Sequence, residues 1–108
     1  ENRINLRELK VRRILLETGA SSTEMTLPAQ SPFCRVDVRA GAASVVLRVP
    51  QGVAGRIVME SGLVGSKIDP QRFPYNGTAY ETPGYDQAER RVEIKVEAGL
   101  GSIEIVSE

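Results

Sequence analysis

The stretch VDVRAGAASVVLRVP (residues 36–50) decides the fold. Val36 and Val38 alternate with charged residues, and this period of two predicts a β-strand. Gly41 comes next, where a glycine can take a positive φ that a Cβ would penalise, and a second apolar segment follows it. Pro50 closes the stretch, because proline cannot donate a hydrogen bond to a β-ladder. The stretch therefore predicts a strand, a glycine turn and a second strand.

The same unit occurs three more times, in residues 14–28, 57–70 and 94–106. In every unit an apolar residue stands five positions before a glycine, which is Gly19, Gly41, Gly62 or Gly99. These glycines are 22, 21 and 37 residues apart, so the last gap is one period plus an insertion, residues 71–87. A single unit cannot cover its apolar face, whereas stacked units can. The repeat predicts about four strand–turn–strand rungs piled around a shared core.

Two all-β architectures fit this rung. If the glycine turn folds its two strands side by side, each unit is a hairpin in an antiparallel sandwich. If the turn carries the chain across to a second sheet, the whole is a short two-sheet β-solenoid. The fixed period and the scarcity of Asn-Gly or Asp-Gly at the unit centres favour the solenoid. We expect residues 1–10, with at most one helical turn over 5–10, and the insertion to cap the two ends of the stack.

The composition excludes several classes of function. The 108 residues suit one domain, 1–108, and 14 basic against 14 acidic residues leave no cationic footprint for nucleic acid. No apolar run is long enough to span a membrane. Because there is no histidine and only one cysteine, Cys34, we predict no catalytic residue, no cofactor and no metal. An enzyme would require Asp69, Glu81 and Asp86 to converge in one cleft.

The insertion concentrates the aromatic residues of the chain. It holds four of the five, namely Phe73, Tyr75, Tyr80 and Tyr85. In one interpretation they cover an end of the core, in an excursion that turns at Asn76-Gly77. In the other they form a partner-binding surface together with Arg90 and Arg91, since tyrosine gives large contact area at low entropic cost. Burial of the rings distinguishes the two interpretations.

The third and fourth units carry a family resemblance. The stretches GRIVMESGLVGSKIDP (residues 55–70) and YETPGYDQAERRVEIKVEAGLGSIEI (residues 80–105) resemble the C-terminal toast-rack domain of LiaF-like proteins, the bacterial cell-wall-active antibiotics response membrane proteins. Tyr85-Asp86 followed by Ala88-Glu89-Arg90-Arg91-Val92 is the most specific part of the resemblance. It extends over essentially the whole chain, although the first two units match only through their glycine turns.

The resemblance implies a non-enzymatic module in envelope-stress signalling. Family members carry membrane-spanning helices before this domain, so we expect membrane association through a segment absent from this chain, on the cytoplasmic side. The implied partner is a membrane sensor kinase, and the family supplies no catalytic or ligand residues. We therefore predict a β scaffold that acts by contact with a protein partner or by self-association through sheet edges. The alternative is an extracellular adhesin-like or glycan-binding β domain.

Overall fold

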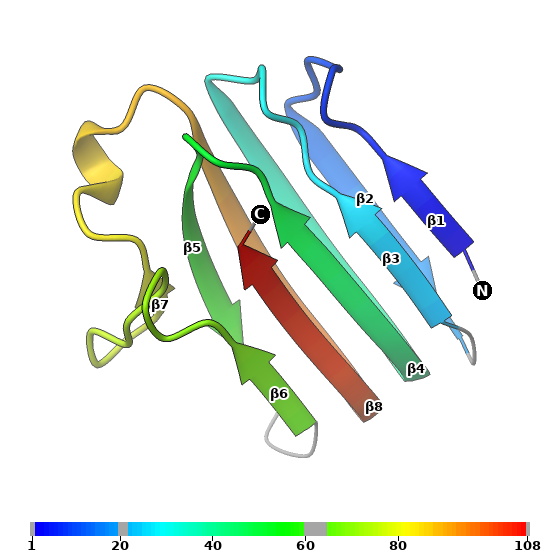
Figure 1. The fold of residues 1–108 in the computed structure, drawn as a ribbon. Coiled ribbons are helices and arrows are strands. Elements are labelled where there is room, and N and C mark those ends of the chain that lie inside the picture. The colour runs from blue at the N-terminus through cyan, green and yellow to red at the C-terminus, as the bar shows by residue number, and fades with distance from the viewer. Residues whose placement is uncertain (1, 20–21, 60–64, 108) are drawn as a thin grey trace.

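The computed structural model describes residues 2–19, 22–59 and 65–107 and is built from strands that lie nearly side by side (Figure 1). The elements are β1 (Asn2–Asn5), β2 (Arg13–Thr18), β3 (Ser22–Thr26), β4 (Phe33–Val49), β5 (Ala54–Met59), β6 (Gly65–Ile68), β7 (Tyr80–Glu81), the short 3-10 helix η1 (Tyr85–Gln87) and β8 (Arg91–Ser107). The prediction of an all-β fold with strand-rich repeats is confirmed.

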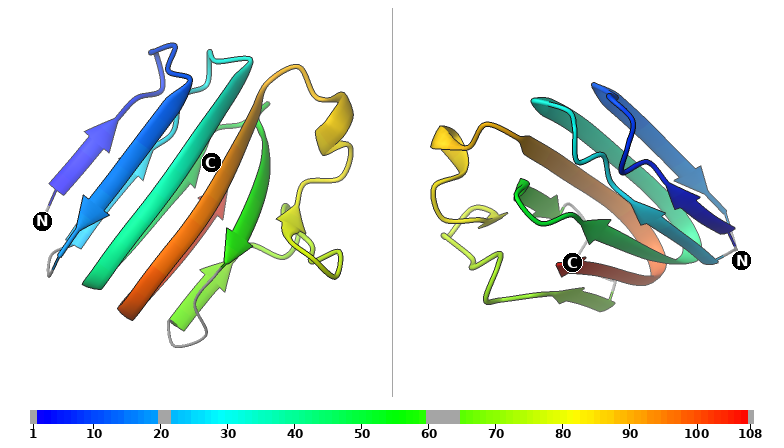
Figure 2. Two further views of the ribbon diagram at one scale, coloured as in Figure 1. Left: turned by 180° about the vertical axis from the view of Figure 1, so that it is seen from behind. Right: turned by 45° about the horizontal axis from the view of Figure 1, so that its top comes forward.

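Two long strands hold the structure together. β4 and β8 each continue past the central glycine of their repeat, and each bends so that its first half belongs to one sheet and its second half to another (Figure 2). The first sheet has the order β2–β4–β8–β5–β7, and the second has the order β1–β3–β4–β8–β6. Each rung thus gives one strand to each sheet.

Parallel pairing between rungs settles how the glycine turn works. Val36 of β4 pairs with Ile94 of β8, and Ile94 pairs with Ile57 of β5, all in parallel register. A hairpin would instead pair the two halves of one unit in antiparallel fashion. The glycine region therefore carries the chain from the first sheet to the second, as the solenoid interpretation predicted.

The rungs do not follow one another in sequence order. β8, the fourth rung, lies between β4 and the third rung, which is formed by β5 and β6. A parallel crossover needs a connection of a dozen or more residues. The segment between Ile68 and Arg91 supplies that length, and it lets the chain pass the third rung and return so that β8 pairs between β4 and that rung. The spacing of the repeats does not predict this change in the order of the rungs.

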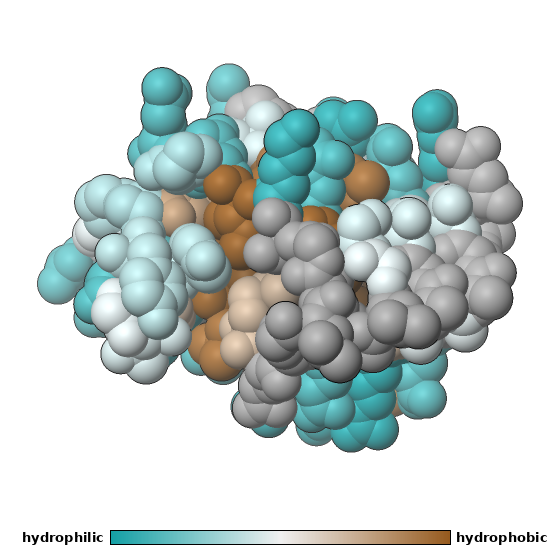
Figure 3. All heavy atoms as spheres, turned by 90° about the horizontal axis from the view of Figure 1, so that it is seen from below, coloured by the Kyte–Doolittle hydropathy of each residue, from teal (hydrophilic) through white to brown (hydrophobic). Residues whose placement is uncertain are grey.

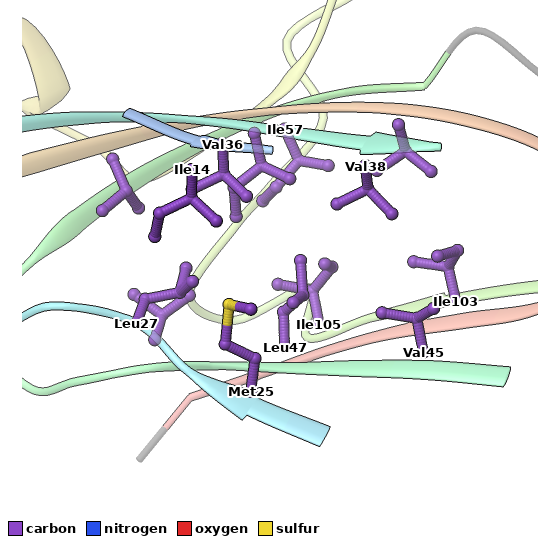
Figure 4. Packing of buried hydrophobic residues seen from close by; sticks show 14 of the residues in the cluster. Ile14, Met25, Leu27, Val36, Val38, Val45, Leu47, Ile57, Ile103 and Ile105 are labelled. Carbon is purple, nitrogen blue, oxygen red and sulfur yellow. The ribbon is translucent and has the colours of Figure 1, made fainter. Parts of the chain in front are cut away.

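The core lies between the two sheets. Ile14, Val36, Val38 and Ile57 point from the first sheet toward Met25, Leu27, Val45, Leu47, Ile103 and Ile105 of the second (Figure 4). Viewed from below, hydrophobic residues appear between hydrophilic layers on either side (Figure 3). Alternation with a period of two thus buries one face of each strand and leaves the charged face in solvent.

The predicted role of Gly41 needs correction. Its φ is not positive, and strand β4 continues through it. A Cβ on Gly41 would lie 3.4 Å from the carbonyl oxygen of Gly19, the glycine at the equivalent place in the first rung. A Cβ at position 41 would therefore be in ordinary van der Waals contact with the bend of the first rung, so the approach of the two rungs does not require glycine there. In the fourth rung the positive φ, 114°, belongs to Gly101. Gly62 lies outside the described residues.

The N-terminal segment is a strand and a turn. β1 pairs in parallel with β3, an element that the polar sequence NRIN did not reveal. Over residues 5–10 the structure has a single turn, in which the Leu9 amide donates to the Leu6 carbonyl at 3.0 Å and the Asn5 side chain accepts from the Arg7 amide. Because β1 adds a strand to the second sheet, the segment lengthens that sheet, and among the described residues no further strand pairs with β1.

Candidate functional site

The excursion between β6 and β8 lies against the edge of the first sheet. Its strand β7 pairs with β5 in antiparallel fashion, with Tyr80 opposite Ile57. A turn at Asn76-Gly77, where the φ of Gly77 is 100°, brings Tyr75 into a bridge with Tyr80. The excursion therefore covers part of the outer edge of β5, at Arg56 and Ile57, which agrees with the capping role predicted for it.

Phe73 and Tyr85 lie inside the protein. The ring of Phe73 is fully buried and fills the space that a side chain at position 55 would occupy, since a Cβ on Gly55 would come within 2.8 Å of its Cε1. Tyr85, in η1, is buried as well, and burial is the main cause that raises the pKa of its hydroxyl. Both rings extend the core, so neither offers its face to a partner.

Tyr75 is the exposed aromatic of the excursion. Its side chain is 59% exposed, whereas Tyr80 is partly buried and packs against the core. The two ring centroids are 4.9 Å apart with an interplanar angle of 51°, and the Tyr75 hydroxyl donates to the Gly77 carbonyl at 3.0 Å. The ring contact and the hydrogen bond hold the Tyr75 ring in place on the surface.

Polar side chains surround Tyr75. Asn76 accepts hydrogen bonds from the amides of Thr78 and Ala79 through Oδ1, and its Nδ2 donates to Glu81 Oε2 at 2.7 Å. A hollow of about 320 Å³ lies here, lined in part by Tyr75, Asn76, Glu81, Asp86 and Gln87. We refer to it as the tyrosine hollow. The sequence pointed to its aromatic residue, to the turn at Asn76 and to the carboxylates of Glu81 and Asp86, but not to their meeting beside the exposed ring.

The two candidate arginines have different surroundings. Arg90 is exposed, and its carbonyl accepts a hydrogen bond from the Ala54 amide. Arg91 opens β8, and its guanidinium lies 5.6 Å from the ring centroid of Tyr85 and 5.7 Å from that of Phe33. The guanidinium of Arg91 thus lies over both the buried ring of Tyr85 in the excursion and the ring of Phe33, the fifth aromatic of the chain.

A third arginine anchors the excursion. The guanidinium of Arg72 donates to the carbonyls of Pro50 and Val53 and to the hydroxyl of Ser107. Burial lowers the pKa of Arg72, and the nearby carboxylate of Asp69 opposes that shift. These bonds tie the start of the excursion to the β4–β5 turn and to the end of β8, so the position of the tyrosine hollow is set by the frame beneath it.

The carboxylates and the thiol that could take part in catalysis do not gather into one site. Glu81 and Asp86 both line the tyrosine hollow, but Asp69 is not part of its wall. Cys34 is fully buried, and burial raises the pKa of its thiol to about 11, which keeps it protonated at neutral pH. Within residues 2–19, 22–59 and 65–107 no cluster of three acidic, histidine or cysteine side chains could hold a metal ion. The same residues include no helix with the length and apolarity to cross a membrane.

Comparison with known proteins gives a likeness of fold. No protein-family model matches the sequence, and no curated protein matches it. The crystal structure of a candidate cell adhesion protein from Clostridium sporogenes ATCC 15579 is similar, with a TM-score of 0.87 and 18% sequence identity. The match covers 98% of this chain and 50% of that one, so the chain spans about half the length of that protein. At this identity the likeness shows a shared fold.

Proposed function

We propose that this chain is a non-enzymatic β scaffold that binds another macromolecule through the tyrosine hollow. The observation that carries the proposal is the exposure of Tyr75, a large ring held in place by Tyr80 while the neighbouring aromatics are buried. A fixed, exposed tyrosine loses little conformational entropy on binding, and interfaces are enriched in tyrosine for this reason. The anchored excursion presents this ring without further rearrangement.

A protein is the first candidate for the bound macromolecule. The resemblance to LiaF-like proteins makes a membrane sensor kinase the partner to try first, with the domain attached to the cytoplasmic side of the membrane through a segment absent from this chain. Tyr75 would supply the apolar contact, and the carboxylates of Glu81 and Asp86 would pair with basic side chains of the partner. In this role the domain would act in envelope-stress signalling by holding its partner.

A glycan is the second candidate. The tyrosine hollow combines an exposed ring with the amides of Asn76 and Gln87 and the carboxylates of Glu81 and Asp86. A sugar presents an apolar face that can stack on such a ring and hydroxyl groups that can donate to carboxylates. The similar Clostridium structure is that of a candidate cell adhesion protein, which agrees with an adhesin-like role.

A photo-crosslinking residue at position 75 tests the proposal. We expect p-benzoylphenylalanine in place of Tyr75 to form a defined adduct in the native bacterial envelope, which mass spectrometry identifies as a protein or a glycan. The matched control is the same residue at Leu9, which is also half exposed but lies in the β1–β2 loop. Adducts no more abundant at position 75 than at position 9 would refute the proposal. On a glycan array, binding lost in Tyr75→Ser would identify the second candidate.

A further inference from the structure

Another hollow lies at the end of the sheets where β2 and β4 begin. The β1–β2 and β3–β4 connections run beside each other at this end (Figure 1), and the Ala29 amide donates to the Arg7 carbonyl across them at 3.0 Å. Nearer to the two strands the connections leave a space of about 500 Å³, lined by Lys10, Val11, Arg12, Ser31, Pro32 and Phe33. We refer to this space as the basic hollow. Among the described residues it shares no lining with the tyrosine hollow.

Hydrogen bonds hold the two walls of the basic hollow together. The Ser31 hydroxyl accepts from the Val11 amide and donates to the Val11 carbonyl, both at 2.8 Å, and Ser31 itself is buried. The Arg35 amide of β4 donates to the Arg12 carbonyl at 2.9 Å. A site that is formed before its ligand arrives loses little conformational entropy on binding. The hydrogen-bonded walls therefore give the hollow a fixed shape.

Apolar side chains form much of the lining. Phe33 is 39% exposed, and Val11, although packed against the core, is only partly buried. Pro32 is exposed as well. The guanidinium of Arg91 lies 5.7 Å from the ring centroid of Phe33, a cation–π contact that restrains the ring. Because small-molecule sites in proteins pair an apolar surface of this kind with a few polar groups, the hollow suits a ligand with a flat apolar body.

The charged residues of the two hollows differ in sign. The described lining of the basic hollow includes two charged side chains, Lys10 and Arg12, and both are exposed cations. The described lining of the tyrosine hollow also includes two, Glu81 and Asp86, and both are anions. The chain as a whole has 14 basic and 14 acidic residues, so this separation of charge is local. An anionic ligand is therefore attracted to the basic hollow and repelled from the tyrosine hollow.

We propose that the basic hollow binds a small organic anion that has a flat apolar body and one carboxylate or phosphate group. In this complex the body lies on the Phe33 ring, against Val11 and Pro32. The planar guanidinium of Arg12 can pair with carboxylate or phosphate oxygens through two parallel hydrogen bonds, and Lys10 adds a second positive charge. The inference goes beyond the proposed binding of a macromolecule at the tyrosine hollow and does not depend on it.

Four naphthalene derivatives test the proposal by NMR titration of the chain. Naphthoate and naphthyl phosphate carry the two acidic groups, naphthylmethanol removes the charge, and naphthylmethylamine reverses it. We expect the tighter of the two anions to bind with a Kd of about 1 mM, the usual value for a ligand of this size. The alcohol and the amine should bind at least about fivefold more weakly. The shifts should centre on the amides of Val11 and Phe33, and acetate, which lacks the apolar body, should give no saturable shift.

Variants of the two cations supply the control. Arg12→Gln should weaken binding of the preferred anion about fivefold, the effect of losing one exposed charge pair. Arg3→Gln removes the same charge from an exposed position of β1 and should leave the affinity unchanged. In the variant Lys10→Glu/Arg12→Glu the hollow should prefer naphthylmethylamine to naphthoate. All three changes replace exposed side chains, and the amide spectrum of each variant checks that the fold is retained.

Several results would overturn the proposal. They are equal affinity for naphthoate and naphthylmethanol, binding of acetate as tight as that of naphthoate, shifts that centre on Tyr75, and no saturable shift with either naphthyl anion. An unchanged preference for the anion in the Lys10→Glu/Arg12→Glu variant would do the same. Because Tyr75→Ser should leave anion binding as it is, failure at the basic hollow is distinct from failure at the tyrosine hollow.

Discussion

Replacing Phe73 by alanine should lower the free energy of unfolding by about 3–5 kcal/mol, the usual cost of removing a buried aromatic ring. The ring is fully buried and is in contact with the backbone at Gly55, so its loss leaves a cavity that the rigid strands cannot close. Chemical denaturation measures the loss. Tyr75→Ala is the matched control from the same excursion, and it should cost less than about 1 kcal/mol, as expected for an exposed residue.

The contact with Gly55 can be tested separately. A Cβ at this position would lie 2.8 Å from the Phe73 ring, so Gly55→Ala should be destabilising in the unmodified protein and much less so beside Phe73→Ala. A double-mutant cycle measures this coupling. Equally small losses from Phe73→Ala and Tyr75→Ala would show that Phe73 is not part of the core, and additive effects at positions 55 and 73 would show that its ring does not contact Gly55.

Ile94→Ala should cost about 2–5 kcal/mol. Ile94 is fully buried in the middle of the first sheet, where it lies between Val36 and Ile57, so three rungs lose contacts at once. Arg48→Ala is the control. Arg48 forms a surface ion pair with Glu24 at 3.0 Å, and such pairs contribute well under 1 kcal/mol. Thermal or chemical denaturation compares the variants, and equal losses would contradict the assignment of inner and outer faces.

Local patterns were sufficient to predict the rungs. Alternation around Val36 and Ile94 is a property of the strand itself, and it identified the inner face before any pairing was known. The order of the rungs depends instead on the path of the excursion, which no period in the sequence records. β1 was missed because four mostly polar residues carry no alternation. The continuation of β4 through Gly41 without a positive φ could not be read from the spacing of the glycines.

The candidate site was predicted only in outline. Four aromatics in one insertion indicated a segment that either covers the core or binds a partner, but the exposure of each ring could not be predicted from the spacing. Phe73 and Tyr75 are two residues apart, and in a regular strand both would point to the same face. Because the chain turns just before Phe73 and bends there before Tyr75 forms its bridge with Tyr80, one ring enters the core and the other stays outside. The polar wall of the tyrosine hollow comes from residues that meet only when Asn76-Gly77 reverses the chain.

The most direct test of the parallel stack is a set of nuclear Overhauser contacts in solution. The parallel stack places Ile94 between Val36 and Ile57, so its methyl groups should show strong contacts to both. It also predicts no close Hα–Hα contacts between residues 35–39 and residues 43–47, because the two halves of β4 lie in different sheets. Close Hα–Hα contacts there, together with no contact between Ile94 and Ile57, would indicate hairpins and contradict the account.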